Sequence, residues 1–538
     1  MHKSCRTLLG AVSAAALALT AAPSNAAEEE AYFDNMTETP QVTHVPRTAD
    51  SYPFNAADHA KEPVDLQALG YVEEEYFLSG EANAYTLSNG DLGIAKADIP
   101  YTNRVLVRRP ADPAKASGTV IVDIYNASNG YDIEDMWRRL YSDILANGHT
   151  YVGVTSKPIN VDALHQFDAE RYEQLSWYDE DCERTPVDFE LGAWQDVPCA
   201  ETGLAWDIIT QTGVALRDAT ASPILLGGIS PTTVLLTGQS QSGMYLNTYV
   251  NNFHNEVTEA NDGNIFDGYL TAAASWIERE IRDGEQQREV SGGIAIAGPA
   301  EPVTIDVPWI TVDTEGDASL FAPEALLPKP TGRTAKVWQI PGTSHTYSMS
   351  PVVPDNAELV KANRPPRNFP AEYTVFPAEP SMWAAMAALI AAHQEGSPLP
   401  ESQWFTRDDA GALTRDDIGN ALGGIRYGML QLGLAEFVGA AKPGDMNGIA
   451  TPITLEEFNA RWTSRQDYLD AQRHVDETLV EQGYLTAAGV EVMQQRAEIL
   501  LDRIGVQGAS DGQPSTEQPV GPLEPGNSSK PGLPKTGV

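Results

Sequence analysis

The chain has 538 residues, which is enough for one large domain with insertions or for two domains. Its 75 acidic and 35 basic residues give a formal net charge of −40, and so acidic a surface repels nucleic acids and anionic membranes. After the first 26 residues, no apolar run approaches the ~20 residues that a membrane-spanning helix needs. We therefore expect neither a nucleic-acid partner nor a membrane span.

The N-terminal 26 residues have the order of a secretory signal peptide. Lys3 and Arg6 precede an apolar stretch, residues 8–22, and the small-residue sequence Ser24-Asn25-Ala26 follows it. We expect residues 1–26 to be cleaved and the mature protein to be secreted into an extracellular or periplasmic space. Residues 27–62 are polar and acidic, and they predict an extended lead-in.

Strand-like and helix-like segments alternate from residue 63 to residue 400, which is the pattern of a parallel α/β sheet. Strands are predicted at residues 119–125, 151–154, 234–237, 269–274, 309–312 and 337–340, and helices at 137–146, 204–217 and 244–254. Two insertions, residues 158–202 and 279–304, interrupt the alternation. Such insertions either cover an active site at the carboxyl ends of the strands or decorate the surface.

The cysteines indicate one disulfide. Cys5 lies in the predicted signal peptide, so the mature chain keeps Cys182 and Cys199, both in the first insertion. In an oxidising compartment these two are expected to pair, which would stabilise the loop by roughly 3 kcal/mol. The sequence has no CxxC or HExxH metal pattern, no phosphate loop and no dinucleotide fingerprint, so no cofactor is expected.

The most informative motif is Gly238-Gln239-Ser240-Gln241-Ser242-Gly243, directly behind an apolar run. It predicts a strand that turns sharply into a helix with a serine at the apex, where a hydroxyl can act as a nucleophile. The residues two before and two after that serine must be small, and Gly238 and Ser242 are. Ser242 fails the same test because Met244 lies two residues beyond it. Ser240 is therefore the predicted nucleophile; the alternative is an ordinary Gly/Ser-rich turn.

A serine nucleophile needs a base, and His345 is the best placed of the nine histidines. It lies in a glycine-containing loop, residues 341–347, immediately after the last predicted strand of the core. A third group should orient the imidazole, and an acidic stretch follows the preceding strand. Asp317 is slightly favoured by its spacing from that strand, and Glu315 stays open as the alternative.

Two backbone N–H groups should bind the oxyanion that forms during acyl transfer. Gln241 is expected to supply one, because it begins a helix directly after the nucleophile. The second should come from the loop at residues 126–130, with Ala127 as the prediction and Ser128 as the alternative.

A smaller region, residues 401–507, follows the core and ends in two predicted helices, residues 455–473 and 487–504. Within it, Arg426 is expected either to pair with Asp416 or Asp417 or to bind an acidic substrate group. Residues 508–538 are rich in Pro, Gly and Ser and predict a flexible tail. Its residues 533–537, LPKTG, resemble the LPxTG sorting signal, so cell-wall association is expected only if the chain continues into an apolar anchor.

Several stretches resemble the secreted "alpha/beta hydrolase domain" group of the α/β-hydrolase superfamily. They are YVEEEYFLSGEANAYT (71–86), GTVIVDIYNASNGYDIEDMW (118–137), GQSQSGMYLNTYV (238–250), PWITVDTEGD (308–317), VWQIPGTSH (337–345) and LTRDDIGNALGGIR (413–426). The resemblance implies a mostly parallel sheet flanked by helices, with insertions over the active site. It also implies Ser240 as nucleophile, His345 as base and an acid within 315–317, and it supplies no substrate.

The resulting hypothesis is a secreted serine hydrolase that cleaves a small-molecule carboxylic ester through an acyl-enzyme. The same catalytic residues suit an amidase or peptidase. A non-catalytic surface or binding protein on a hydrolase scaffold is the alternative from another class.

Overall fold

The computed structural model describes residues 35–88, 91–177, 187–188, 197–282, 288–290, 294–296, 304–320, 334–346, 354–366, 376–442 and 445–507. The predicted signal peptide and the predicted C-terminal tail lie outside these ranges. Within them, no helix combines the length and the apolar character that crossing a membrane requires.

A nine-stranded sheet runs through the molecule in the order β1-β2-β3-β5-β4-β6-β7-β10-β11. From β5 to β11 every neighbouring pair is parallel, whereas β1, β2 and β3 pair antiparallel and β3 joins β5 antiparallel. The predicted mostly parallel sheet is confirmed. The strands are β1 (Gln41–Val45), β2 (Tyr71–Ser88), β3 (Asp91–Pro110), β4 (Thr119–Ile124), β5 (Thr150–Val154), β6 (Thr233–Gln239), β7 (Gly268–Ala272), β10 (Trp309–Thr314) and β11 (Ala335–Ile340).

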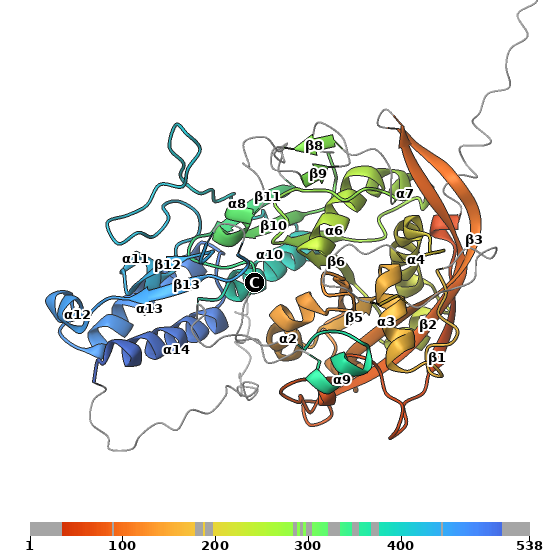
Figure 1. Ribbon diagram of the computed structural model, residues 1–538, viewed down its shortest axis with the longest axis horizontal. Helices are drawn as coiled ribbons and strands as arrows, with labels where there is room; N and C mark the ends of the chain where they lie inside the picture. The colour runs from red at the N-terminus through yellow and green to blue at the C-terminus, as the bar shows by residue number, and fades with distance from the viewer. Residues whose placement is uncertain are drawn as a thin grey trace, which may run out of the picture.

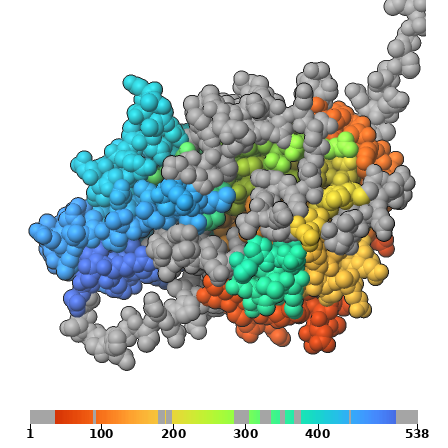
Figure 2. All heavy atoms as spheres, in the orientation of Figure 1, coloured from red at the N-terminus to blue at the C-terminus, as the bar shows by residue number. Residues whose placement is uncertain are grey.

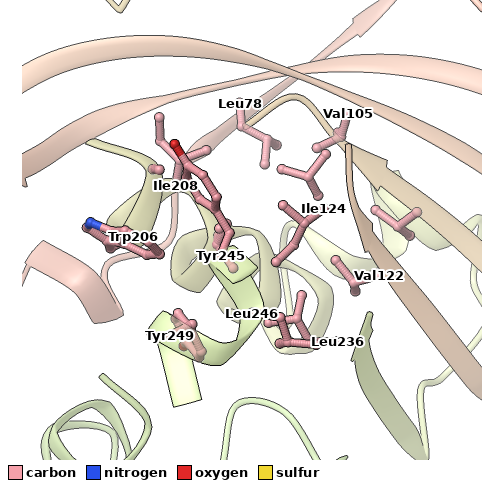
Figure 3. Close-up of a cluster of buried hydrophobic side chains, with 14 of the residues drawn as sticks. Leu78, Val105, Val122, Ile124, Trp206, Ile208, Leu236, Tyr245, Leu246 and Tyr249 are labelled. Atoms are coloured by element: carbon pink, nitrogen blue, oxygen red, sulfur yellow. The ribbon is translucent and has the colours of Figure 1, made fainter. Parts of the chain in front are cut away.

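Helices cover both faces of the parallel part, which is why its strands are continuous apolar runs rather than alternating ones. In β4, Val120, Val122 and Ile124 face one core cluster and Ile121 faces the other. The first cluster includes side chains of α4 (Ala205–Arg217) and α6 (Gln241–Asn252), and part of it is drawn in Figure 3. The second includes side chains of α2 (Asp135–Asn147) and α10 (Glu379–Glu395).

Smaller helices complete the core region. They are α3 (Pro158–Phe167), α5 (Ser222–Leu226), α7 (His254–Ala260), α8 (Glu315–Leu320) and α9 (Asn356–Lys361). The first ten residues of the predicted insertion 158–202 thus form a helix. A short hairpin, β8 (Arg288–Val290) and β9 (Ile294–Ile296), lies within the second insertion.

The long hairpin of β2 and β3 was not among the predicted strands. These strands pair from Tyr71↔Pro110 to Ser88↔Asp91, and β1, from the predicted lead-in, adds to their outer edge. Buried charges interrupt the apolar pattern of these strands. Arg104 and Arg108 flank the buried Val105 and Val107, and they pair with Glu75 and Glu134 inside the protein.

The C-terminal region continues the edge of the sheet beyond β11. Gln403 N donates to Val337 O (2.8 Å), and Gln339 N donates to Gln403 O (3.0 Å). The region forms one end of the molecule, opposite the β2–β3 hairpin (Figures 1 and 2). Its elements are α11 (Gly428–Gln431), β12 (Ala435–Val438), β13 (Ile449–Pro452), α12 (Leu455–Arg461), α13 (Arg465–Glu481) and α14 (Ala487–Ile504).

The predicted helix at residues 455–473 is two helices, because α13 has its own N-terminal cap. Ser464 is extended, and its hydroxyl accepts a hydrogen bond from Asp467 N (3.0 Å). The chain therefore breaks at residues 462–464 before helix α13 begins. The prediction for α14 is confirmed at both ends.

Candidate active site

Ser240 lies at the junction of β6 and α6, in a strained backbone conformation. Its φ of 55° and ψ of −121° place it where L-residues are rare. Its N–H donates to Ala272 O on β7 (2.9 Å), which fixes the turn. A Cβ at Gly238 would lie 2.4 Å from Ser242 O, so the turn closes only with a glycine there. The size requirement inferred from the sequence thus has a steric cause.

A hydrogen-bonded chain links Ser240 to His345 and Asp317. Ser240 Oγ lies 2.8 Å from His345 Nε2, and His345 Nδ1 lies 2.5 Å from Asp317 Oδ1. His345 and Asp317 are buried at 2% and 0% exposure, whereas Ser240 is partly exposed. The serine therefore borders solvent, whereas the two groups behind it are shielded from water.

The two candidate acids point in different directions. The second oxygen of Asp317 accepts a hydrogen bond from Thr314 N (2.6 Å), which leaves the first to face His345. Glu315 Oε2 instead accepts from Gly342 N (2.8 Å), and Oε1 pairs with Arg415 Nη2 (2.7 Å). The turn between β10 and α8 therefore brings Asp317 to the imidazole and Glu315 to the backbone of the histidine loop.

Side chains that the sequence did not reveal hold the loop that carries His345. Arg139 Nη2 donates to His345 O (3.1 Å), and Arg139 Nη1 pairs with Glu379 Oε1 (2.8 Å). Thr346 N donates to Met446 O (2.9 Å) in the C-terminal region. The sequence shows Arg139 only as a charged residue in the predicted helix 137–146, which does not identify its partners.

The predicted oxyanion loop lies directly against the serine turn. Asn126 Nδ2 donates to Gln239 O (3.0 Å), and Ala127 N donates to Gln241 Oε1 (2.8 Å). The Ala127 N–H is thus already bonded to a side chain, so it can serve an oxyanion only after the Gln241 side chain rotates away. The alternative, Ser128 N, donates to Asn126 Oδ1 (2.6 Å).

The first insertion contributes apolar side chains beside this loop. Val187 and Val197 pack in one cluster with Ala127 and Ile159. Cys199 is disulfide-bonded. Its predicted partner, Cys182, lies outside the described residues, so the pairing stays a prediction.

Arg426 pairs with Asp416, which is the structural one of the two roles considered for it. Within the described part of the chain, no group of three or more His, Cys, Asp or Glu side chains could hold a metal ion.

Among solved structures, the chain is similar to several esterases at low identity. For acetyl xylan esterase 1 from Thermoanaerobacterium sp., identity is 11%, coverage 47% of this chain and 59% of that chain, and the TM-score 0.21. The rice cell wall degrading esterase LipA from Xanthomonas oryzae is 9% identical; the match covers 45% of this chain and 50% of that chain, with a TM-score of 0.23. Est1E from Butyrivibrio proteoclasticus is 8% identical; the match covers 52% of this chain and 94% of that chain, with a TM-score of 0.23. No curated protein matches the chain.

The match to a protein-family model covers much more of the chain than the matches to these structures do. Residues 37–495 match the family model described as "Alpha/beta hydrolase domain". This range contains the whole sheet, the serine turn, the histidine loop and nearly all of the C-terminal region. The chain belongs to this alpha/beta hydrolase family.

Proposed function

We propose that this protein is a secreted serine hydrolase that cleaves carboxylic esters of small molecules. The observation that carries the proposal is the hydrogen-bonded chain from Ser240 Oγ through His345 to Asp317, with distances of 2.8 and 2.5 Å. This order of hydroxyl, imidazole and carboxylate suits general-base activation of a serine. The strained turn at Ser240 supports the same role, because it presents the hydroxyl at the end of a strand.

The reaction follows from this arrangement in two halves. His345 Nε2 takes the proton of Ser240 as Oγ bonds to the acyl carbon, and Asp317 stabilises the imidazolium. The tetrahedral oxyanion collapses, and the alcohol leaves with the proton from Nε2. Water then attacks the acyl-enzyme, gives its proton to His345, and the acid is released as Ser240 regains its hydrogen.

The oxyanion would rest on backbone amides at the start of α6 and in the loop after β4. Gln241 N is proposed as the first donor, where the helix dipole adds positive potential. Ala127 N is proposed as the second, on the condition that the substrate oxygen replaces Gln241 Oε1 as its acceptor. Substrate binding would thus exchange one hydrogen bond of Ala127 for another.

The sequence of residues 1–26 supports export, and an oxidising compartment is consistent with the disulfide at Cys199. A folded esterase released outside the cytoplasm would meet small diffusible esters without a membrane partner.

The proposal is tested with the purified protein and its Ser240→Ala variant on a panel of acetyl, butyryl, long-chain and aromatic p-nitrophenyl esters. We expect turnover that Ser240→Ala abolishes, and a fluorophosphonate adduct on Ser240. Full activity in Ser240→Ala, or an adduct on Ser242, would overturn the mechanism. Faster turnover of a matched anilide than of the ester would indicate an amidase, and neither labelling nor turnover a non-catalytic protein.

A further inference from the structure

Lys157 is a buried lysine next to the proposed active site, and the mechanism above does not use it. It directly precedes α3 and is 4% exposed, and among the residues that the structure describes no carboxylate forms an ion pair with it, which is rare for a buried lysine. Its Nζ donates to three neutral oxygens: Tyr125 O (2.8 Å), Ser156 Oγ (2.7 Å) and Ser242 Oγ (3.0 Å). The chain therefore keeps a strongly polar group at a buried site, which calls for a specific use.

The surroundings of this amine are apolar on one side. Nζ lies 4.2 Å from the centre of the Tyr245 ring, and Figure 3 shows Tyr245 in the core beside Trp206 and Leu246. Burial lowers the pKa of Lys157 well below its usual value of 10.5. A neutral amine still donates two hydrogens and accepts one from a serine hydroxyl, so Nζ can bond all three oxygens in either protonation state.

Two of these three oxygens, Tyr125 O and Ser242 Oγ, belong to the two segments that must face each other across the oxyanion, and the third belongs to the residue before Lys157. Tyr125 is the residue immediately before the oxyanion loop, and Ser242 lies in the first turn of α6, two residues after Ser240. Lys157 thus connects the residue before the oxyanion loop to the first turn of the helix that follows Ser240. A positional error of about 1 Å between such groups can cost about 10²-fold in rate.

The bonds of Lys157 to Tyr125 O and Ser242 Oγ matter most once substrate is bound, because another contact between the loop and the turn must then break. In the free protein, the contacts that join the loop to the turn include Asn126 Nδ2 to Gln239 O and Ala127 N to Gln241 Oε1. The second must break if Ala127 N is to meet the oxyanion. The bonds of Asn126 and Lys157 remain in place when that contact breaks, so they continue to join the loop to the turn.

We propose that Lys157 is a positioning residue of the esterase, which fixes the oxyanion loop relative to Ser240 by bonding Tyr125 O and Ser242 Oγ together. This inference rests on the proposed function. Lys157 does not touch the reacting atoms, so its contribution should appear in binding of the tetrahedral state rather than of the ester.

The test is Lys157→Met, which keeps the aliphatic stem against Tyr245, and Tyr125 O keeps its bond from Ser156 Oγ (2.8 Å). We expect kcat to fall about 10²-fold with KM changed by less than about threefold. The inhibition constant of a trifluoromethyl ketone, which forms a tetrahedral oxyanion on the serine, should rise in proportion to the loss of kcat/KM. The matched control is Lys361→Met, an exposed lysine whose Nζ also lies over a tyrosine ring, at 5.6 Å from the Tyr52 centroid.

A folded Lys157→Met with the kcat and inhibition constant of Lys361→Met would overturn the inference. So would a lower kcat with an unchanged inhibition constant, because that points to a role in the fold alone. If Lys157→Met does not fold, Ser242→Ala decides: it removes one acceptor, and we expect a roughly fivefold loss of kcat with an equal rise in the inhibition constant. Ser240→Ala is measured alongside, since activity remaining in that variant would refute the proposed function, whatever Lys157 does.

Discussion

The acid of the proposed triad can be tested by changing one atom in each of two neighbouring carboxylates. In Asp317→Asn, the new amide should keep its oxygen on Thr314 N, because that buried N–H needs the acceptor it has at 2.6 Å. The NH2 group then faces His345 Nδ1, which must accept rather than donate. The proton moves to Nε2, and His345 can no longer take the proton of Ser240.

This tautomer change determines how far kcat should fall in Asp317→Asn. Loss of the correct imidazole tautomer lowers kcat by about 10⁴-fold, which corresponds to about 5.4 kcal/mol of transition-state stabilisation. Glu315→Gln is the matched control, since it changes the same atom type two residues away. It keeps an oxygen for Gly342 N and loses the carboxylate charge that pairs with Arg415; the Glu315 side chain is 2% exposed and that of Arg415 36%. The buried carboxylate makes some loss of stability expected, but Arg415 can still be hydrated and His345 keeps Asp317, so the loss should not reach the triad.

The assay measures kcat and KM on a p-nitrophenyl ester together with the thermal midpoint of each variant. We expect Asp317→Asn to fold normally and lose about 10⁴-fold in kcat, and Glu315→Gln to stay within about fivefold of the parent. Equal losses in the two variants would show that the reasoning from the hydrogen bonds is wrong. An Asp317→Asn variant that keeps a tenth of the activity would exclude Asp317 as the acid.

Two further predictions concern the serine turn. Gly238→Ala should lower the free energy of unfolding in urea by more than about 2 kcal/mol, because its Cβ would lie 2.4 Å from a backbone oxygen. The control, Gly228→Ala, has a φ of +87° and open space around it, so it should lower that free energy by only about 1 kcal/mol; equal losses would contradict the steric argument. Gln241→Ala removes the side-chain acceptor of the Ala127 N–H and keeps the backbone donor of residue 241. We expect kcat/KM for an acetyl ester to rise roughly fivefold, which corresponds to the free energy of one neutral hydrogen bond. A tenfold fall would show instead that the Gln241 side chain holds the loop in its active position.

The serine turn could be predicted because its constraints are local. The clash between a Cβ at residue 238 and Ser242 O arises within five residues, so the sequence Gly238-x-Ser240-x-Ser242 carries the conformation with it. The central strands could be predicted for a similar reason: burial on both faces requires apolar runs such as that of β4. The place of His345 followed from the strand before it.

The choice between Asp317 and Glu315 could not be made from sequence, because both are carboxylates near the end of the same strand. It depends on the turn in which Thr314 N binds Asp317, and on Arg415, which lies 100 residues away in the chain. Arg139 and Lys157 were missed for the same reason. Their partners near the active site, His345 and Ser242, are 206 and 85 residues distant, and no local pattern records such contacts.

The contacts of the C-terminal region show that it supports the proposed catalytic loops as well as covering the sheet. Arg415 pairs with Glu315, whose other oxygen binds the loop of His345 at Gly342 N. Thr346, the residue after His345, donates to Met446 O. A Cβ at Gly439 would lie 2.3 Å from Gly316 N, so the two backbones touch beside the turn that carries Asp317.

These contacts lie on the acid and histidine side of the site, whereas Lys157 and Asn126 hold the oxyanion side. The serine turn itself is fixed by the central strands through Ala272 O. Each part of the proposed triad is thus positioned by a different segment of the chain, and the sheet edge at β11 is completed by Gln403 of the C-terminal region. Because that edge strand leads directly into the histidine loop, we infer that residues 401–507 form part of the catalytic unit and not a separable domain.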